Sequence, residues 1–119
     1  VINNAQGYDV LGTDVSCNLG STNIPNLMKS PDFGKSVESM VRALTYVTDH
    51  SAIDVVPSVQ NGNDLAHSIG LGAMGLHTYF AKHHMHYGSP ESLDFTNQYF
   101  LLLNYYSLKA SNQIARGVS

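Results

Sequence analysis

The sequence has little charge, one cysteine and no long apolar run, and each of these shortages excludes a class of protein. Charged residues make up 13% of the chain, against roughly 25% in an average soluble domain, which indicates that other protein covers much of the surface. The formal net charge is −3, and the lysines and arginines do not cluster, so the basic footprint of a nucleic-acid-binding protein is missing. No apolar run approaches the roughly 20 residues that cross a bilayer. We therefore expect no direct contact with nucleic acid or with a membrane.

The single cysteine, Cys17, excludes a scaffold that is cross-linked by internal disulfides. The first residues have neither the basic region nor the apolar region of a secretion signal, so we expect a cytoplasmic setting. They also lack an initiator Met, which predicts an internal segment or a processed product. The length suits one compact unit, and residues 1–119 are interpreted as a single segment.

Apolar spacing and start signals predict three helices. Apolar residues recur every three or four positions in each, and a Ser-Pro pair, typical of a helix start, precedes two of them. A proline within a β-branched stretch makes residues 55–59 a connection. The predicted helices span about residues 31 or 35 to 50, about 64 to 84 after a capping cluster at 61–64, and about 90 to 115.

Residues 1–30 are rich in Asn, Gly, Ser and Thr and predict loops around one or two short strands, near residues 8–11 and 14–17. Cys17 is placed at a strand end, followed by a polar, small-residue turn over residues 18–22. The third helix is apolar on nearly every side at residues 100–103. Because such a helix is normally buried among several neighbours, its partners are expected to lie in another part of a larger fold.

Residues 70–75 read GLGAMG and fit the dinucleotide-binding pattern G-x-G-x-x-G. The predicted context is a helix instead of a strand, so these glycines are interpreted chiefly as sites of close helix packing. A small nucleotide-binding domain remains an alternative.

Histidines gather in His83-His84-Met85-His86, with His77 upstream. Zinc favours ligands on one helix face with an acidic or thiolate partner, and this spacing points the rings apart. A solvated helix end is the simpler interpretation, and we expect no metal site in this segment.

A lone cysteine in an apolar strand is most often a small buried hydrophobic residue, and a purely structural helical module with an inert Cys17 is a second alternative. The small polar residues that follow Cys17 would let a ligand or a second thiol approach the sulfur. Cys17 is therefore the candidate catalytic residue.

The segment around Cys17, DVSCNLGSTNI at 14–24, resembles the part of ribonucleotide reductase large chains that carries one cysteine of the active-site redox pair. Further stretches resemble the bacterial class Ib large chain in the same order: SPDFG at 30–34, VRALT at 41–45, SIGLGAMGLH at 68–77, HYGS at 86–89, LDFTN at 93–97 and ASNQIA at 110–115. The resemblance covers nearly the whole chain. It implies an incomplete domain, a mainly helical slice with one or two strands from a ten-stranded α/β barrel.

The resemblance also implies the chemistry. The family reduces ribonucleotides, here expected to be diphosphates, to deoxyribonucleotides for DNA synthesis with a cysteine radical and a redox cysteine pair. The radical cysteine stands in an Asn-x-Cys-x-Glu pattern, whereas here Asn18 follows the cysteine and Leu19 stands where the Glu would be. Cys17 thus matches the redox position, and it would pair with a cysteine outside this segment.

By the same resemblance, the implied partners are the remainder of the large chain, a small radical-generating subunit with a dimetal centre, a thioredoxin- or glutaredoxin-like reductant, the ribonucleotide substrate and nucleotide effectors such as ATP. The segment itself is expected to hold no cofactor, and to be inactive alone.

Overall fold

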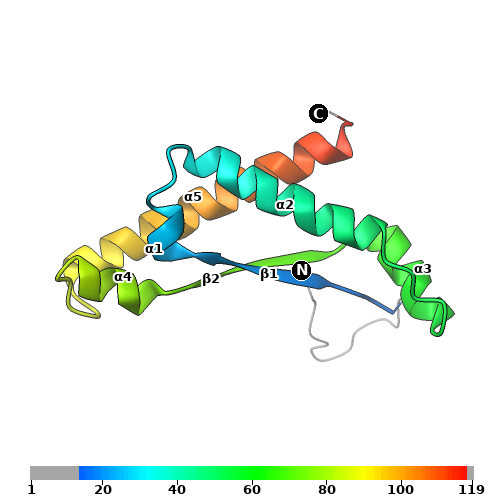
Figure 1. Cartoon of the computed structure of the whole chain (residues 1–119), viewed down its shortest axis with the longest axis horizontal. Coiled ribbons are helices and arrows are strands. Elements are labelled where there is room, and N and C mark those ends of the chain that lie inside the picture. The colour runs from blue at the N-terminus through cyan, green and yellow to red at the C-terminus, as the bar shows by residue number, and fades with distance from the viewer. Residues whose placement is uncertain (1–13, 118–119) are drawn as a thin grey trace, which may run out of the picture.

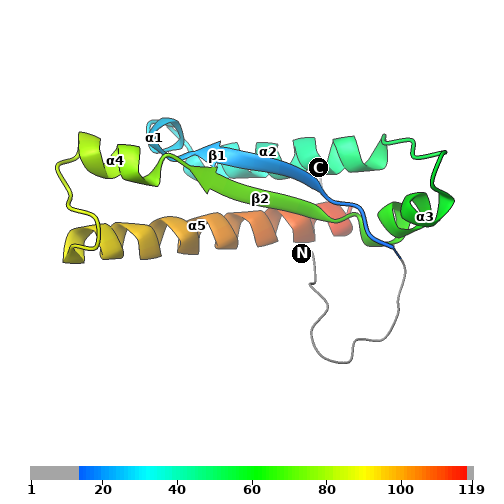
Figure 2. The ribbon, with the colours of Figure 1, turned by 90° about the horizontal axis from the view of Figure 1, so that it is seen from below.

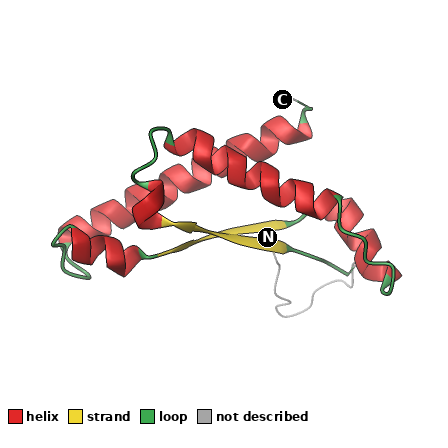
Figure 3. Cartoon of the chain, in the orientation of Figure 1, coloured by secondary structure: helices red, strands yellow, loops and turns green. Residues whose placement is uncertain are grey.

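A computed structural model gives the fold of the chain and describes residues 14–117. Within this range the chain forms two short strands and five helices (Figure 1 and Figure 3). In chain order they are β1 (Asn18–Asn23), α1 (Ile24–Leu27), α2 (Phe33–Asp49), α3 (Pro57–Ala66), β2 (Ile69–Met74), α4 (Leu76–Lys82) and α5 (Pro90–Ala115). The prediction of a mainly helical segment with one or two strands is confirmed.

The two strands form a parallel pair whose register runs from Asn18 opposite Ile69 to Asn23 opposite Met74. Helices α2 and α5 lie on one side of this pair, while α3 and α4 lie near its two ends (Figure 1). The view from below shows the strands between α2 and α5 in projection, with no helix in front of them (Figure 2). Parallel strands that carry helices on one side are the wall element of an α/β barrel.

The first and third predicted helices are confirmed as α2 and α5. The Asp32 carboxylate accepts a hydrogen bond from the Lys35 backbone N–H (3.0 Å) and caps the start of α2. The Ser89 hydroxyl accepts from the Ser92 N–H (3.2 Å) at the start of α5, where Pro90 follows it as the first helical residue. In both cases the capping side chain accepts from a backbone N–H of the first turn, which has no acceptor within the helix.

Helices α2 and α5 pack against each other and against the strands. At the crossing, a Cβ on Gly34 would stand 2.5 Å from Cε1 of Tyr106, so glycine allows the closest approach. Phe33 meets Tyr99 edge to face, with ring centroids 5.6 Å apart. The buried residues of this core are Ile24, Leu27, Val37, Tyr99 and Leu103.

The opposite side of α5 is apolar and exposed. Leu93, Leu101 and Leu108 each leave more than three fifths of their surface open, and the described residues supply no cover for them. No helix in residues 14–117 combines the length and the apolar character needed to span a membrane.

The predictions around Cys17 need correction. Residues 18–22, expected to be a polar turn, belong to β1, and Cys17 precedes this strand instead of ending one. Asn, Gly and Ser have low strand propensity, and the strand forms because β2, about 50 residues further along the chain, supplies its hydrogen-bonding partner. The strand expected near residues 8–11 lies outside the described residues.

The second predicted helix is wrong as one continuous element. Residues 69–74 form β2, and a helix resumes only at Leu76, after Gly75 with a positive φ of 84°. The capping cluster at 61–64 lies inside α3, which begins at Pro57 within the expected connection and ends at His67 in a left-handed conformation. The apolar spacing that suggested one helix is divided between a strand and a short helix.

Candidate active site

Cys17 is a free, half-buried thiol one residue before β1. Its Sγ lies 3.5 Å from the point where a Cβ on Gly70 would stand, so the sulfur rests beside the start of β2. Glycine at this position leaves the space to the Leu19 side chain, whose Cδ2 lies 2.5 Å from the same point.

The alternation of side chains along β1 decides which way Cys17 faces. The Asn18 amide reaches Thr48 of α2, a Cβ on Gly20 would contact Leu44 of α2, and the Thr22 hydroxyl reaches Tyr99 of α5. Since successive side chains of a strand point to opposite faces, residues 17, 19 and 21 face away from the helices. The thiol therefore lies on the helix-free side of the strand pair, which faces the viewer in Figure 2.

On this helix-free face the Leu19 side chain lies next to Gly70 and the sulfur. By the strand register, Gly70 lies beside Leu19 and Gly72 beside Ser21. Leu19 is 72% exposed and Met74, further along the face, is 56% exposed. From this side a small molecule or a second sulfur would meet the exposed Leu19 side chain and, among residues 14–117, no helix.

A buried hydroxyl chain ties the strand pair to α5. Thr22 Oγ1 donates to the Gly72 carbonyl (3.0 Å), and because its one proton is used there, the Tyr99 hydroxyl donates to Thr22 Oγ1 (2.7 Å). Burial raises the pKa of Tyr99 above its usual value of 10.0, because removal from water disfavours the phenolate. Sequence patterns gave no sign of this chain, since its members are 50 and 77 residues apart.

The glycine pattern at 70–75 lies mostly within a strand, so the expected helical context was wrong. Its first two glycines lie inside β2, paired with β1, and only Gly75 lies in the turn before α4. In the dinucleotide-binding pattern the glycines form the turn after the strand and approach the pyrophosphate there. The observed placement instead leaves Gly70 against Leu19 and Cys17.

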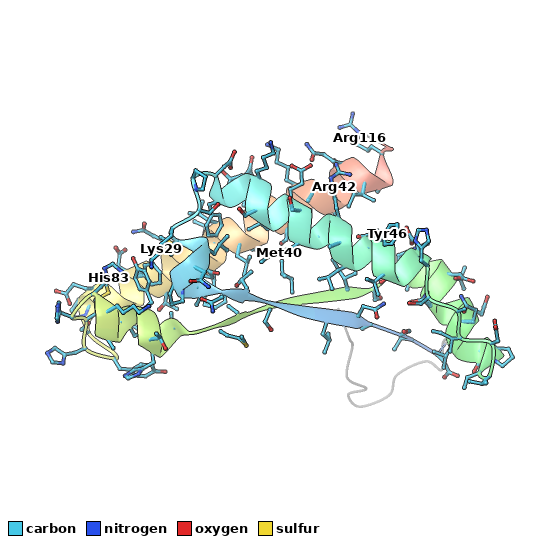
Figure 4. All side chains as sticks on the ribbon, viewed as in Figure 1. Lys29, Met40, Arg42, Tyr46, His83 and Arg116 are labelled. Carbon is cyan, nitrogen blue, oxygen red and sulfur yellow. The ribbon has the colours of Figure 1, made fainter. Side chains whose placement is uncertain are left out.

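The histidine cluster follows α4, which lies near the end of the strand pair opposite to the thiol. His83, labelled in Figure 4, stacks on Tyr79 with ring centroids 4.1 Å apart. Among residues 14–117, no three His, Cys, Asp or Glu side chains come together in a group that could hold a metal ion. Figure 4 also places Arg42 and Arg116 on the side of α2 and α5 that is remote from the strands.

Comparison with known proteins identifies the family of the fold that holds this thiol. A family model described as the ribonucleotide reductase barrel domain matches residues 4–118. The chain belongs to this family. The resemblance found in the sequence is thereby confirmed, and the parallel strand pair with helices on one side is a part of that barrel domain.

Relatives of this barrel domain are large subunits of reductases. A ribonucleoside-diphosphate reductase subunit alpha of Mycoplasma pneumoniae is 43% identical over 109 residues, which are 91% of this chain and 15% of that subunit. The subunit alpha of Bacillus subtilis is 44% identical over 108 residues, again 91% and 15% of the two chains. A large subunit from equine herpesvirus 1 is 33% identical over 114 residues, 84% of this chain and 14% of the relative.

Identity is thus higher with the two bacterial subunits than with the viral one, in agreement with the predicted bacterial resemblance. The chain spans about 15% of the length of the bacterial relatives. The redox role of Cys17 stays a prediction.

Proposed function

We propose that the chain is a segment of the catalytic subunit of a class Ib ribonucleotide reductase, in which Cys17 is one thiol of the redox pair. The observation that carries the proposal is the position of Cys17 at the start of a wall strand of the barrel, on the face without helices. In an α/β barrel the helices lie outside, so the opposite face of the strands points into the barrel. A half-buried thiol there is available to a bound substrate and to a second thiol.

The proposed reaction uses two thiols as the reductant. Cys17 and a cysteine outside this segment together give two electrons and two protons, the 2′ hydroxyl of the ribose leaves as water, and the two sulfurs join as a disulfide. An external dithiol then reduces this disulfide by exchange through a mixed disulfide. The substrate is a ribonucleoside diphosphate, since the relatives carry that substrate class in their names.

The rest of the proposed enzyme lies outside this segment. Other segments complete a ten-stranded barrel, and the exposed apolar residues Leu19, Met74 and Leu101 support such cover. The cysteine that carries the radical belongs to another part of the large chain, and the dimetal centre that generates the radical belongs to a small subunit. A thioredoxin- or glutaredoxin-like protein regenerates the dithiol, nucleotide effectors act elsewhere on the large chain, and the assembly is cytoplasmic.

The test is Cys17→Ser in the assembled reductase that contains this segment, with the neighbouring Ser16→Ala as the matched control. We expect the Cys17 variant to lose steady-state turnover driven by an external dithiol, while the Ser16 variant keeps it. Peptide mapping of the wild-type enzyme after turnover without reductant should find Cys17 in a disulfide with a cysteine from outside residues 1–119. Undiminished turnover of Cys17→Ser would overturn the proposal.

An inert structural thiol makes the opposite prediction. Such a cysteine would react with an alkylating reagent only after unfolding. The partial exposure of Cys17 favours reaction in the folded state. Alkylation of the native enzyme, followed by mass spectrometry of the Cys17 peptide, separates the two cases.

A further inference from the structure

Three polar side chains lie behind Cys17, on the helix side of the strands: the buried Thr48 and Asn63, and the half-buried Asn18. At the centre of this group is Thr48, a fully buried residue near the end of α2. Its Oγ1 accepts a hydrogen bond from the Asn18 amide (2.9 Å), and its backbone carbonyl accepts one from the amide of Asn63 in α3 (2.9 Å). One residue of α2 thus joins α3 to the first residue of β1, which directly follows Cys17.

A second contact holds the chain on the other side of Cys17. Gly62 of α3 lies so close to Asp14 that a Cβ at this position would overlap the Asp14 carbonyl oxygen. The short stretch from Asp14 to Asn18 is therefore held at both of its ends by α2 and α3. Cys17 lies between these two points, with its sulfur on the opposite face, beside Gly70.

The polar composition of this group is not required for packing. Asn63 is buried, and its Oδ1 has no hydrogen-bond partner, which costs stability because a buried polar atom loses its water. Apolar side chains of similar size would fill the same space without that loss. The hydrogen bonds determine which face of β1 each side chain occupies, because they fix the orientation of its first residue, Asn18. A shift of one residue in a strand would move every side chain to the other face.

We propose that Asn18, Thr48 and Asn63 are positioning residues for Cys17, and that they hold its sulfur where it meets the second thiol of the redox pair. This inference rests on the proposed redox role of Cys17. A disulfide forms only when the two Cβ atoms are within a narrow range of distance and the torsion about the sulfurs is near a right angle. The polar group meets this need from behind the strand, because it leaves the face that carries the sulfur open.

The test compares three substitutions in α2 of the assembled reductase. Thr48→Val keeps the shape and removes the hydroxyl that receives the Asn18 amide, and Thr48→Ser restores a hydroxyl. Thr45→Val is the matched control, because Thr45 Oγ1 donates only to the Val41 carbonyl within the same helix (2.8 Å). The readouts are steady-state turnover with a dithiol reductant and the midpoint of the Cys17 disulfide in a thiol–disulfide redox buffer, with thermal unfolding measured alongside.

We expect Thr48→Val to lower turnover by about tenfold to a hundredfold, the effect of a small misplacement of a reacting group, and to shift the redox midpoint. Thr48→Ser should recover both values, and Thr45→Val should match the wild type in both. A purely structural role would lower the unfolding temperature of Thr48→Val without moving the redox midpoint of the molecules that remain folded, and that result overturns the inference.

Cys17→Ser separates this inference from the proposed function. If Cys17→Ser keeps full turnover, the redox role itself is wrong. If it abolishes turnover while Thr48→Val behaves like Thr45→Val, the redox role stands and the positioning role is wrong. Should Thr48→Val fail to assemble, Asn18→Ala removes the same hydrogen bond from the strand side, and a wild-type redox midpoint in that variant refutes the positioning role.

Discussion

The buried hydroxyl chain from Tyr99 through Thr22 to Gly72 allows a quantitative test of how the strands are attached to α5. Thr22 and Tyr99 are 0% and 2% exposed, so water cannot replace a partner that is removed. Thr22→Val leaves the Tyr99 hydroxyl buried without an acceptor, which should cost about 1–3 kcal/mol of unfolding free energy. Tyr99→Phe removes one hydrogen bond and leaves Thr22 bonded to Gly72, so the expected cost is about 1 kcal/mol.

The double variant should cost less than the sum of the two single variants, because no hydroxyl is then left without its partner. We expect a coupling free energy of about 1 kcal/mol, within the range measured for residues in one hydrogen-bond network. Urea denaturation of the chain, followed by far-ultraviolet circular dichroism, gives the three free energies. Thr45→Val combined with Tyr99→Phe is the control pair, since Thr45 donates within its own helix, and it should be additive within about 0.5 kcal/mol. If the unfolding free-energy changes of the Thr22 and Tyr99 variants were additive to the same extent, the proposed chain of hydrogen-bond donors would be refuted.

Three further predictions concern stability. The pKa of Tyr99 is raised in the folded state by burial. The neutral Tyr99 side chain therefore contributes its full share of the unfolding free energy below the unfolded pKa of about 10, and this share is lost as the pH rises through the folded pKa. The urea midpoints of Tyr99→Phe should consequently fall less steeply above pH 10 than those of the wild type. Gly62→Ala should destabilise the fold by about 1–3 kcal/mol in the same assay, although alanine favours a helix by about 1 kcal/mol, because the new Cβ would overlap the Asp14 carbonyl oxygen, a backbone atom. Gly34→Ala should cost less than Gly62→Ala, because the Tyr106 ring that blocks the new Cβ is a side chain that can rotate; an equal or larger cost would contradict this order.

The described part of the barrel domain leaves apolar surface and strand edges uncovered. The exposed apolar side of α5 and the two outer edges of the strand pair present surface that a complete barrel would bury. The same openness gives Cys17 its accessible face.

The amino-acid sequence by itself determined the elements whose signals are local. Helices α2 and α5 begin at Asp32 and Ser89 because side-chain oxygens there accept backbone hydrogen bonds three residues on, and such signals are visible in a few consecutive residues. Cys17 was also found from the sequence, as the one thiol in a stretch that resembles a known redox position.

Only the tertiary structure decided the strands and the surroundings of the thiol. β1 and β2 are short and rich in glycine or small polar residues, so each is stable as a strand only when the other lies beside it. For the same reason the sequence could not show that Asn18 points to Thr48, or that Cys17 points away from the helices. The face on which a strand side chain lies depends on pairing with residues about 50 positions away, and no local pattern contains that information.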